Sequence, residues 1–255
     1  MPAKVDRYAR HTVIPEIGDA GQQKITDSAV LIVGCGALGS VHAHLLARAG
    51  VGHVRIVDAD LPEEVNLQRQ ILFDEVDVAH QTPKAIIAAN KLRKINSTIK
   101  VEGLNTRADA SNIEELIKGM SLVMDASDNF ETRYLINDAC VKNGQAWVYG
   151  GVIGTTGMTM PIIPGHSPCM RCVFPEPPEP GSSPSGVTAG ILNSAPLTVG
   201  ALQSTAALKI LVGATLEPYQ LTLLDLWQAS FRSVEVLREK ECPCCQLGRF
   251  EFLKP

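Results

Sequence analysis

Three glycines with Gly-x-Gly-x-x-Gly spacing, Gly34, Gly36 and Gly39, follow the apolar run 29–33. Between a strand and a helix, this spacing makes a tight turn that lets the backbone approach a phosphate or ribose. Asp58 comes about 20 residues later, at the end of a second apolar run, which suits a carboxylate that binds ribose hydroxyls. The pattern predicts a nucleotide site, and alone it is typical of NAD or FAD proteins.

Three charged residues beyond the glycines favour a nucleoside triphosphate. Arg69 follows the second apolar run, where a guanidinium can hold phosphate oxygens in pairs. Lys84, at the start of an expected helix, offers a second cation. Asp128 follows the run 122–125, at a strand end where doubly wound sheets bind ligands, and can hold Mg²⁺ beside substrate phosphates. Alone, each is more often a surface charge or, for Asp128, a helix N-cap; their joint placement favours a site.

Two Cys-x-x-Cys pairs predict a structural zinc site. Cys169 and Cys172 form the first pair, and Cys242 and Cys245 form the second. Four thiolates complete a tetrahedral site and leave no position for a substrate. Because the pairs are distant in sequence, the metal would fasten the C-terminal tail to the segment around residue 170. Cys244 stays an alternative ligand.

The composition is that of an ordinary globular protein. The chain has 255 residues and a net charge of −4, so it shows no basic face for nucleic acid. The first ten residues lack the apolar core of a secretory signal. We interpret the apolar segment 195–214, which contains Lys209, as a buried helix that could face another subunit rather than as a membrane span. Seven cysteines then favour metal or redox chemistry in a reducing, cytoplasmic compartment.

Apolar runs that alternate with amphipathic segments predict an α/β fold, with a doubly wound, Rossmann-like and mainly parallel sheet. Antiparallel C-terminal strands should extend this sheet. The expected strands span 29–33, 54–58, 99–103, 121–125, 146–150, 219–226 and 230–237, and the expected helices span 37–49, 82–95, 111–118, 130–143 and 195–212. Residues 150–163 are glycine-rich and β-prone, and 175–186 have the composition of a solvated linker.

Together these motifs resemble the MoeB/ThiF/HesA family of ubiquitin-activating-enzyme-like adenylyltransferases. The resemblance rests on Arg7–His11, Gly34–Gly39, Asp58, Asp60, Asn66–Gln70, Pro83-Lys84, Asp125–Asn129 and both cysteine pairs. It implies one ThiF-type adenylation domain over residues 1–255. That domain would comprise a helical arm (1–28), a nucleotide-binding half (29–150) and a carrier-binding and zinc half (151–255).

The resemblance also implies roles for individual residues. Asp58 and Asn66 would hold the ribose, and Arg10 would reach into a neighbouring subunit's site, which implies a homodimer. The implied catalytic residues are Arg10, Arg69, Lys84 and Asp128. The implied ATP-binding residues are Gly34, Gly36, Ala37, Gly39, Asp58, Asp60, Asn66, Arg69, Lys84, Asp128 and Asn129, with Mg²⁺ on Asp128 and Zn²⁺ on Cys169, Cys172, Cys242 and Cys245.

The expected reaction is ATP-dependent adenylation of the C-terminal glycine of a ubiquitin-like sulfur-carrier protein ending in Gly-Gly, preparing it for thiocarboxylate formation. An NAD-dependent oxidoreductase is the alternative. Many relatives carry a cysteine in a loop before an Ala-Gly pair, but here residues 184–190 contain none. We expect no sulfurtransferase region after Pro255, so the enzyme would stop at the adenylate and sulfide or a separate donor would complete the transfer. The carrier's pathway (molybdopterin, thiamine, cysteine or tRNA thiolation) stays open.

Overall fold

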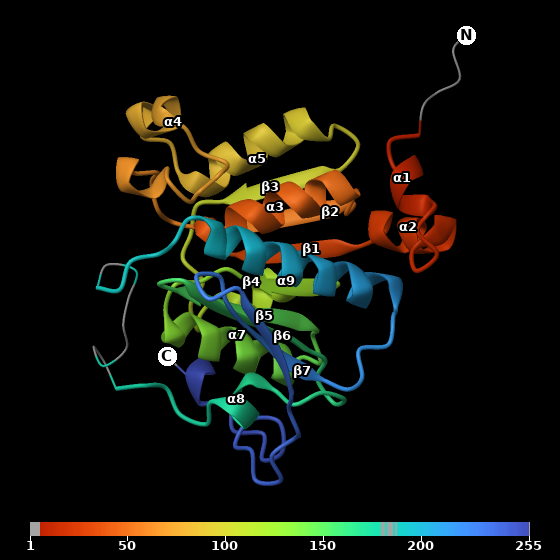
Figure 1. Ribbon diagram of the computed structural model, residues 1–255, viewed down its shortest axis with the longest axis vertical. Coiled ribbons are helices and arrows are strands. Elements are labelled where there is room, and N and C mark those ends of the chain that lie inside the picture. The colour runs from red at the N-terminus through yellow and green to blue at the C-terminus, as the bar shows by residue number, and fades with distance from the viewer. Residues whose placement is uncertain (1–5, 180–181, 183–185, 187, 255) are drawn as a thin grey trace.

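One eight-stranded sheet forms the centre of the computed structural model, which describes residues 6–179, 182, 186 and 188–254 (Figure 1). The strand order is β3-β2-β1-β4-β5-β6-β7-β8. The parallel strands are β1 (Ala29–Val33), β2 (His53–Val57), β3 (Lys100–Leu104), β4 (Leu122–Asp125) and β5 (Trp147–Ile153). The antiparallel strands are β6 (Thr156–Ile162), β7 (Gln220–Asp225) and β8 (Ser230–Glu235). The predicted fold class is therefore confirmed.

The register brings the carboxyl ends of three strands to the same level. Val33 at the end of β1 pairs with Val57 of β2 on one side and with Asp125 of β4 on the other. The backbone N–H of Gly34 donates to the carbonyl of Val57 at 2.8 Å, and that of Ala126 donates to the carbonyl of Val33 at 2.9 Å. The residues that directly follow these three strands therefore lie together at one edge of the sheet.

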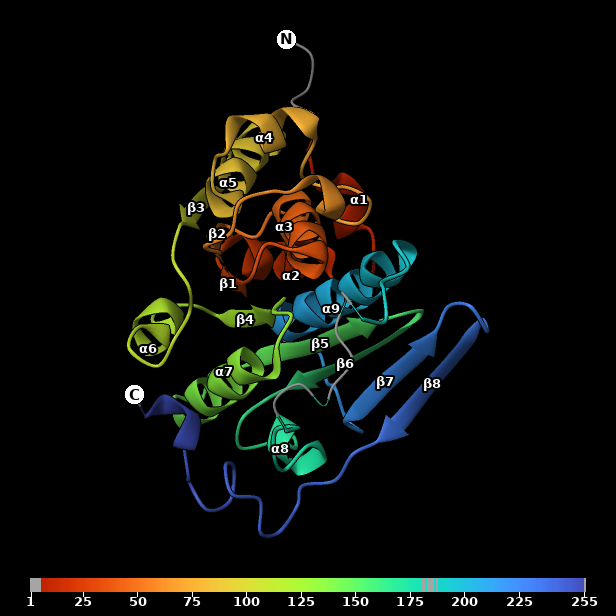
Figure 2. The same cartoon turned by 90° about the vertical axis from the view of Figure 1, so that its left-hand side faces the viewer.

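Helices cover both faces of this sheet because the strands are apolar on both sides. Along β1, Val30 and Ile32 join the core under α3 (Ala37–Ala49), α5 (Lys84–Ile95) and α9 (Ser194–Val212), whereas Leu31 and Val33 join the core under α6 (Ile113–Ile117) and α7 (Phe130–Lys142) (Figure 2). This alternation is the period of a strand with two buried faces. It yields the doubly wound arrangement that the apolar runs predicted.

The N-terminal arm contains α1 (Ala9–Thr12) and α2 (Gly18–Thr26) and lies at the opposite end of the sheet from the carboxyl ends of the parallel strands (Figure 1). Tyr8 packs against Gly50, directly after the end of α3, and Gly21 of α2 packs against Val212 at the end of α9. These contacts fix the arm to the far ends of two long helices.

Helix α9 is long and apolar enough to span a membrane by length and composition, and 44% of its most apolar window is buried in the protein. Core helices pass the same test. Gln203 of α9 is buried against the sheet, where it donates to the Asp125 carbonyl, whereas Leu197 is 37% exposed. Helix α9 thus packs as a core helix, and its exposed side carries Leu197, Ala201, Thr205 and Lys209.

Short elements were not predicted. These are α4 (Glu75–His80), α8 (Met170–Val173) and the 3-10 turns Glu64–Asn66 and Glu251–Leu253. They are too short to show a hydrophobic period, although Asp74 and Asp77 form a capping box on α4. Of the predicted linker 175–186, residues 180, 181 and 183–185 lie outside the described residues, and 175–179 have no regular structure.

Candidate nucleotide and metal sites

The glycine loop, residues 34–39, connects β1 to α3 through two positions that only glycine can occupy. Gly34 has φ +96°, and a Cβ there would lie 2.6 Å from the carbonyl oxygen of Ala126. A Cβ on Gly39 would lie 2.1 Å from the carbonyl oxygen of Gly34. Gly36 is the N-cap of α3, and no side chain caps this helix. The first N–H groups of α3 are therefore available to an anionic ligand.

Asp58, directly after β2, holds the glycine loop from the side. One carboxylate oxygen accepts from the backbone N–H of Cys35 at 2.6 Å, and the other accepts from that of Asp60 at 2.7 Å. Burial raises the pKa of Asp58 above its ordinary value. The Cys35 thiol itself is fully buried, as expected for a packing residue. The structure thus places Asp58 beside the glycines, where the sequence predicted it.

Lys84 is an almost buried cation at the N-terminus of α5, with 5% of its surface exposed. Its Nζ lies 3.7 Å from Oδ2 of Asp60, which is beyond hydrogen-bond distance, and that aspartate is itself largely exposed. A helix N-terminus carries positive partial charge, so a lysine there is disfavoured. A buried ammonium also needs a close anionic partner. Lys84 is therefore a buried cation near the glycine loop, paired with the exposed carboxylate of Asp60 and close to that of Asp58.

Asn66, Arg69 and Gln70 form one hydrogen-bonded group beside the glycine loop. The Asn66 side-chain oxygen accepts from Arg69 Nη2 at 3.2 Å and from Gln70 Nε2 at 3.1 Å. Gln70 Nε2 also lies 3.6 Å from the position of a Cβ on Gly36. Because both donors bond to the amide oxygen of Asn66, its NH₂ group is directed away from Arg69 and Gln70. This orientation suits donation to a ribose oxygen.

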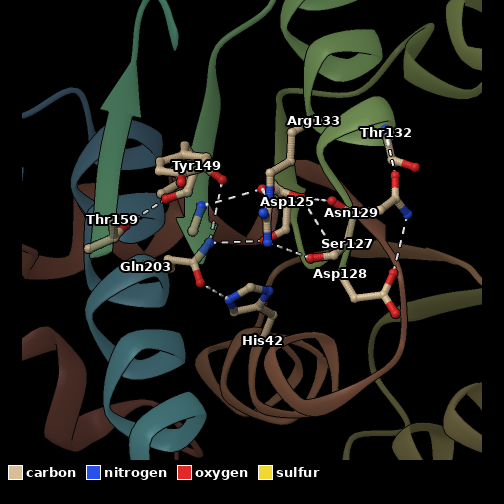
Figure 3. Close-up of polar contacts among 12 residues, drawn as sticks. His42, Asp125, Ser127, Asp128, Asn129, Thr132, Arg133, Tyr149, Thr159 and Gln203 are labelled. Atoms are coloured by element: carbon tan, nitrogen blue, oxygen red, sulfur yellow. Dashed lines mark hydrogen bonds and ion pairs between the residues drawn. The ribbon is translucent and has the colours of Figure 1, made fainter. Parts of the chain in front are cut away.

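The turn after β4, residues 126–129, carries the predicted magnesium ligand. Asp128 is exposed, and its carboxylate accepts from Asn129 Nδ2 at 3.2 Å (Figure 3). Asn129, and not Asp128, is the N-cap of α7, since its side-chain oxygen accepts from the backbone N–H of Thr132 at 2.8 Å. The capping alternative for Asp128 is thus wrong. Its carboxylate keeps acceptor positions for a cation.

Polar residues to which the sequence pattern assigns no role lie behind this turn. Asp125 is fully buried and ion-paired to Arg133 (Figure 3). Gln203 of α9 donates to the Asp125 carbonyl at 3.0 Å and accepts from His42 Nε2 at 2.9 Å. Burial lowers the pKa of His42 from 6.5 to about 4. The signal that could have found Asp125 is its place at the end of a strand whose other residues are apolar.

Arg10 lies in α1 and is exposed, at the end of the molecule opposite its own glycine loop. Helix α3 separates the two and, with 13 residues, is about 20 Å long. Tyr8 contacts the end of this helix, and the glycine loop is at its start. The structure brings together all the other predicted nucleotide-site residues, but Arg10 cannot reach the site of its own chain.

The four predicted zinc ligands lie together in the structure. The sulfurs of Cys169, Cys172, Cys242 and Cys245 all lie within 4.8 Å of one another, and the two closest pairs are 3.6 and 3.5 Å apart. Thiolates at about 2.3 Å from a tetrahedral zinc lie roughly 3.8 Å apart, so the cluster is compatible with this ion. Cys244 lies outside the group and accepts a hydrogen bond from Asn137 Nδ2 at 3.2 Å.

A buried arginine holds the C-terminal tail beside the cysteine cluster. Arg171, between the first two cysteines, is 1% exposed. It donates to the Glu251 carboxylate at 3.0 Å and to the carbonyls of Pro175 at 3.2 Å and Arg249 at 3.4 Å. The tail is thus tied to α8 by charge as well as by the cysteines.

The glycine loop, the strand-end carboxylates and the cysteine cluster define an α/β nucleotide-binding protein of Rossmann-like fold with a metal-site candidate outside the nucleotide edge. A model of the ThiF family matches residues 8–245, and the chain belongs to this family. It is 43% identical over 249 residues to the Sulfur carrier protein ThiS adenylyltransferase of Bacillus subtilis, covering 97% of this chain and 73% of that protein. It is 41% identical over 253 residues to the SAMP-activating enzyme E1 of Haloferax volcanii, covering 98% and 92%.

Other relatives agree with this assignment. The chain is 40% identical over 249 residues to the Sulfur carrier protein adenylyltransferase of Thermus thermophilus, covering 95% of this chain and 91% of that protein. Among solved structures, Escherichia coli MccB with ATP superposes with a TM-score of 0.80 at 22% identity, covering 94% of this chain and 74% of that one. At this identity the likeness concerns the fold alone, and it agrees with the predicted sheet.

Proposed function

We propose that this protein adenylates the C-terminal glycine of a ubiquitin-like sulfur-carrier protein with ATP. The observation that carries the proposal is Lys84, a buried ammonium at a helix N-terminus with its charge partner at 3.7 Å. A polyphosphate beside the glycine loop would give Lys84 a further anionic partner. The relatives that are sulfur-carrier adenylyltransferases support a sulfur-carrier protein as the acceptor of the adenylyl group. The oxidoreductase alternative leaves Lys84 and Arg69 without a role.

The chemistry needs positioning and charge compensation rather than a base. A carboxylate oxygen of the carrier's terminal glycine attacks the α-phosphorus of ATP, the bond to the β-phosphate oxygen breaks, and pyrophosphate leaves. The glycine carboxylate is already ionised at neutral pH, so no proton moves. Two anions must nevertheless approach each other. Arg69 and Lys84 offset this repulsion and the charge that develops on pyrophosphate.

Asp58 and Asn66 are the proposed ribose ligands, and residues 34–39 the proposed phosphate cradle. Asp128 is the residue that would hold Mg²⁺, because one exposed carboxylate beside substrate phosphates is the usual donor set for this ion. When bound, the ion neutralises phosphate charge. Asp60 and Asn129 line the same edge, but the first faces Lys84 and the second caps α7, so we assign them to the support of the site.

The four-cysteine cluster is proposed to hold a structural zinc ion. Its four sulfurs leave no open position for a substrate. We propose that residues 1–255 act as one adenylation unit, since β5 (Trp147–Ile153) runs through the expected boundary between the halves at residue 150 and both halves share one sheet.

We propose a homodimer, and the positions of Arg10 and α9 support it. Helices α3 and α9 run in the same direction, because Gly200 meets Val41 near their starts and Val212 reaches the N-terminal arm. When two copies pair through the exposed side of α9, a two-fold axis perpendicular to this helix places the partner's α9 antiparallel to it. The partner's arm then lies at the start of this α9, close to the glycine loop. Arg10 can thus serve the partner's site while it is distant from its own.

The carrier surface is proposed to lie along β8, the last strand of the sheet. Its free edge can accept a strand of a partner, and large apolar side chains are exposed on and beside it. Strand β8 lies at the outer edge of the sheet (Figure 2). Phe231 is 60% exposed and Leu237 is 75% exposed, and Trp227, in the turn before β8, is 74% exposed. Sulfur would come from sulfide or a separate donor, and we propose that the reaction takes place in the cytoplasm.

ATP–pyrophosphate exchange tests the function. Exchange should depend on a carrier ending in Gly-Gly and should disappear when the last glycine of the carrier is removed. Lys84→Met should lower it about 100-fold, as expected for the loss of one charge that stabilises the transition state. Lys91→Met is the matched control, since Lys91 lies on the same helix but pairs with Asp74 and Asp77. Exchange without any carrier, or an unimpaired Lys84→Met enzyme, would refute the proposal.

Mixing two inactive variants tests the dimer. Arg10→Ala and Lys84→Met subunits should complement each other, because a mixed dimer has one site with both residues intact. Random pairing of equal amounts should restore about a quarter of the wild-type exchange rate. If the mixture stays inactive although the subunits exchange, Arg10 does not act in the partner's site.

A further inference from the structure

A buried ion pair lies directly behind the turn that carries Asp128. Asp125 at the end of β4 has no exposed side-chain surface, and that of Arg133 on α7 is 10% exposed. Arg133 Nε lies 3.4 Å from Asp125 Oδ2 (Figure 3). The guanidinium also lies over the rings of Phe130 and Tyr149, at 5.3 and 5.8 Å from their centres. Both charges are thus fixed in place.

The hydrogen bonds of this pair converge on Ser127, the residue before Asp128. Asp125 Oδ1 accepts from the Ser127 backbone N–H at 2.9 Å and from its hydroxyl at 2.6 Å. Arg133 Nη2 donates to the Ser127 carbonyl at 3.0 Å. On the other side, the cap on α7 fixes Asn129. The backbone on both sides of Asp128 is therefore held, while its exposed carboxylate stays available.

Stability alone does not explain such a pair. Two buried charges lose their hydration, and apolar residues of similar volume often replace a buried ion pair without loss of stability. What apolar residues cannot supply is a set of directed hydrogen bonds to one turn. A ligand carboxylate that is already in position binds its ion without first losing backbone freedom.

We propose that Asp125 and Arg133 are positioning residues that hold residues 127–129 so that the Asp128 carboxylate points at the divalent cation of the bound nucleotide. This inference rests on the proposed function, in which Asp128 holds that cation. Arg133 acts through Ser127 and touches neither nucleotide nor carrier. Its role is to preorganise the turn.

Binding of Mn²⁺ as a probe for Mg²⁺ tests the proposal without turnover. Free Mn²⁺ is measured by electron paramagnetic resonance in the presence of the protein and a non-hydrolysable ATP analogue. The double variant Asp125→Asn/Arg133→Met removes both buried charges, so no unpaired charge remains to unfold the protein. We expect Mn²⁺ to bind the variant's nucleotide complex about 10-fold more weakly, and the analogue alone to bind within twofold of wild type.

Two further variants make the result specific. Arg55→Met/Glu102→Gln removes another ion pair, with 2.7 Å between Nε and Oε2, from the middle of β2 and β3 and should leave Mn²⁺ binding unchanged. Arg133→Lys keeps the charge and should recover part of the affinity. A folded Asp125→Asn/Arg133→Met protein with wild-type Mn²⁺ affinity overturns the proposal, as does an equal loss of analogue binding without metal.

The variant Asp128→Asn distinguishes a failure of this inference from a failure of the proposed metal role of Asp128. If Asp128→Asn weakens Mn²⁺ binding and the ion-pair variant does not, the positioning role alone is overturned and Asp128 remains the metal ligand. If Asp128→Asn also leaves Mn²⁺ binding unchanged, both the positioning role and the proposed metal role of Asp128 are overturned.

Discussion

Protonation of His42 should couple the stability of this protein to pH. The imidazole is fully buried between α3 and α9, where its Nε2 donates to Gln203 and its Nδ1 has no partner among the described residues. Burial lowers its pKa from 6.5 to about 4, so the folded protein keeps it neutral. In the unfolded chain the same group takes up a proton below pH 6.5. Stability is therefore full above pH 6.5 and is lost as the pH falls towards 4.

The size of this effect follows from the two pKa values. One pKa step corresponds to about 1.4 kcal/mol, so a fall from 6.5 to about 4 corresponds to roughly 3 kcal/mol once the pH is below both values. At pH 5 the unfolded imidazole is almost fully protonated and the folded one is not. The loss of free energy of unfolding between pH 7 and pH 5 is then about 2 kcal/mol.

Urea unfolding of wild type and His42→Gln at pH 7 and pH 5 measures this coupling. The uncharged variant should lose about 2 kcal/mol less than wild type over the interval, whatever its stability at pH 7. His80→Gln is the control, because His80 is exposed at the end of α4. Equal losses in wild type and His42→Gln would show that the buried imidazole does not resist protonation.

Three further outcomes are expected. Gly39→Ala should weaken binding of an ATP analogue at least about 10-fold in calorimetry, because the new Cβ meets the Gly34 oxygen at 2.1 Å; wild-type affinity would contradict the geometry. Arg171→Met should lower the free energy of unfolding by about 3 kcal/mol, since a buried arginine loses several charge-assisted bonds to the tail; a change below 1 kcal/mol would speak against the tie. Cys245→Ser should lose bound zinc in elemental analysis and Cys244→Ser should keep it; the reverse would exchange their roles.

Local patterns were enough to predict the elements that form the nucleotide edge. The run 29–33 coincides with β1, and the predicted helix 37–49 coincides with α3. Both agree because a buried strand, a glycine turn and a helix leave signals within a few residues of one another. The β-prone stretch 150–163 contains the hairpin of β5 and β6, but its composition alone did not define the strands.

Residues that act through distant partners could not be assigned from the sequence. His42, Asp125, Arg133 and Gln203 lie on three helices and a strand and meet only because those elements pack together. Each has the side chain of an ordinary surface residue. Their burial is a property of the packed sheet and helices, so no local pattern could indicate it.

The sequence by itself determined the family, the nucleotide edge and the two cysteine pairs, because glycine turns, strand ends and Cys-x-x-Cys spacing are short-range chemistry. Only the tertiary structure decided that the four sulfurs meet, that Cys244 hydrogen-bonds to Asn137, and that Asn129 caps α7 while the Asp128 carboxylate stays exposed. It also decided that Lys84 is buried and lies 3.7 Å from the exposed carboxylate of Asp60. These facts depend on burial and on distances between segments that are far apart in the chain. Local sequence patterns do not indicate either quantity.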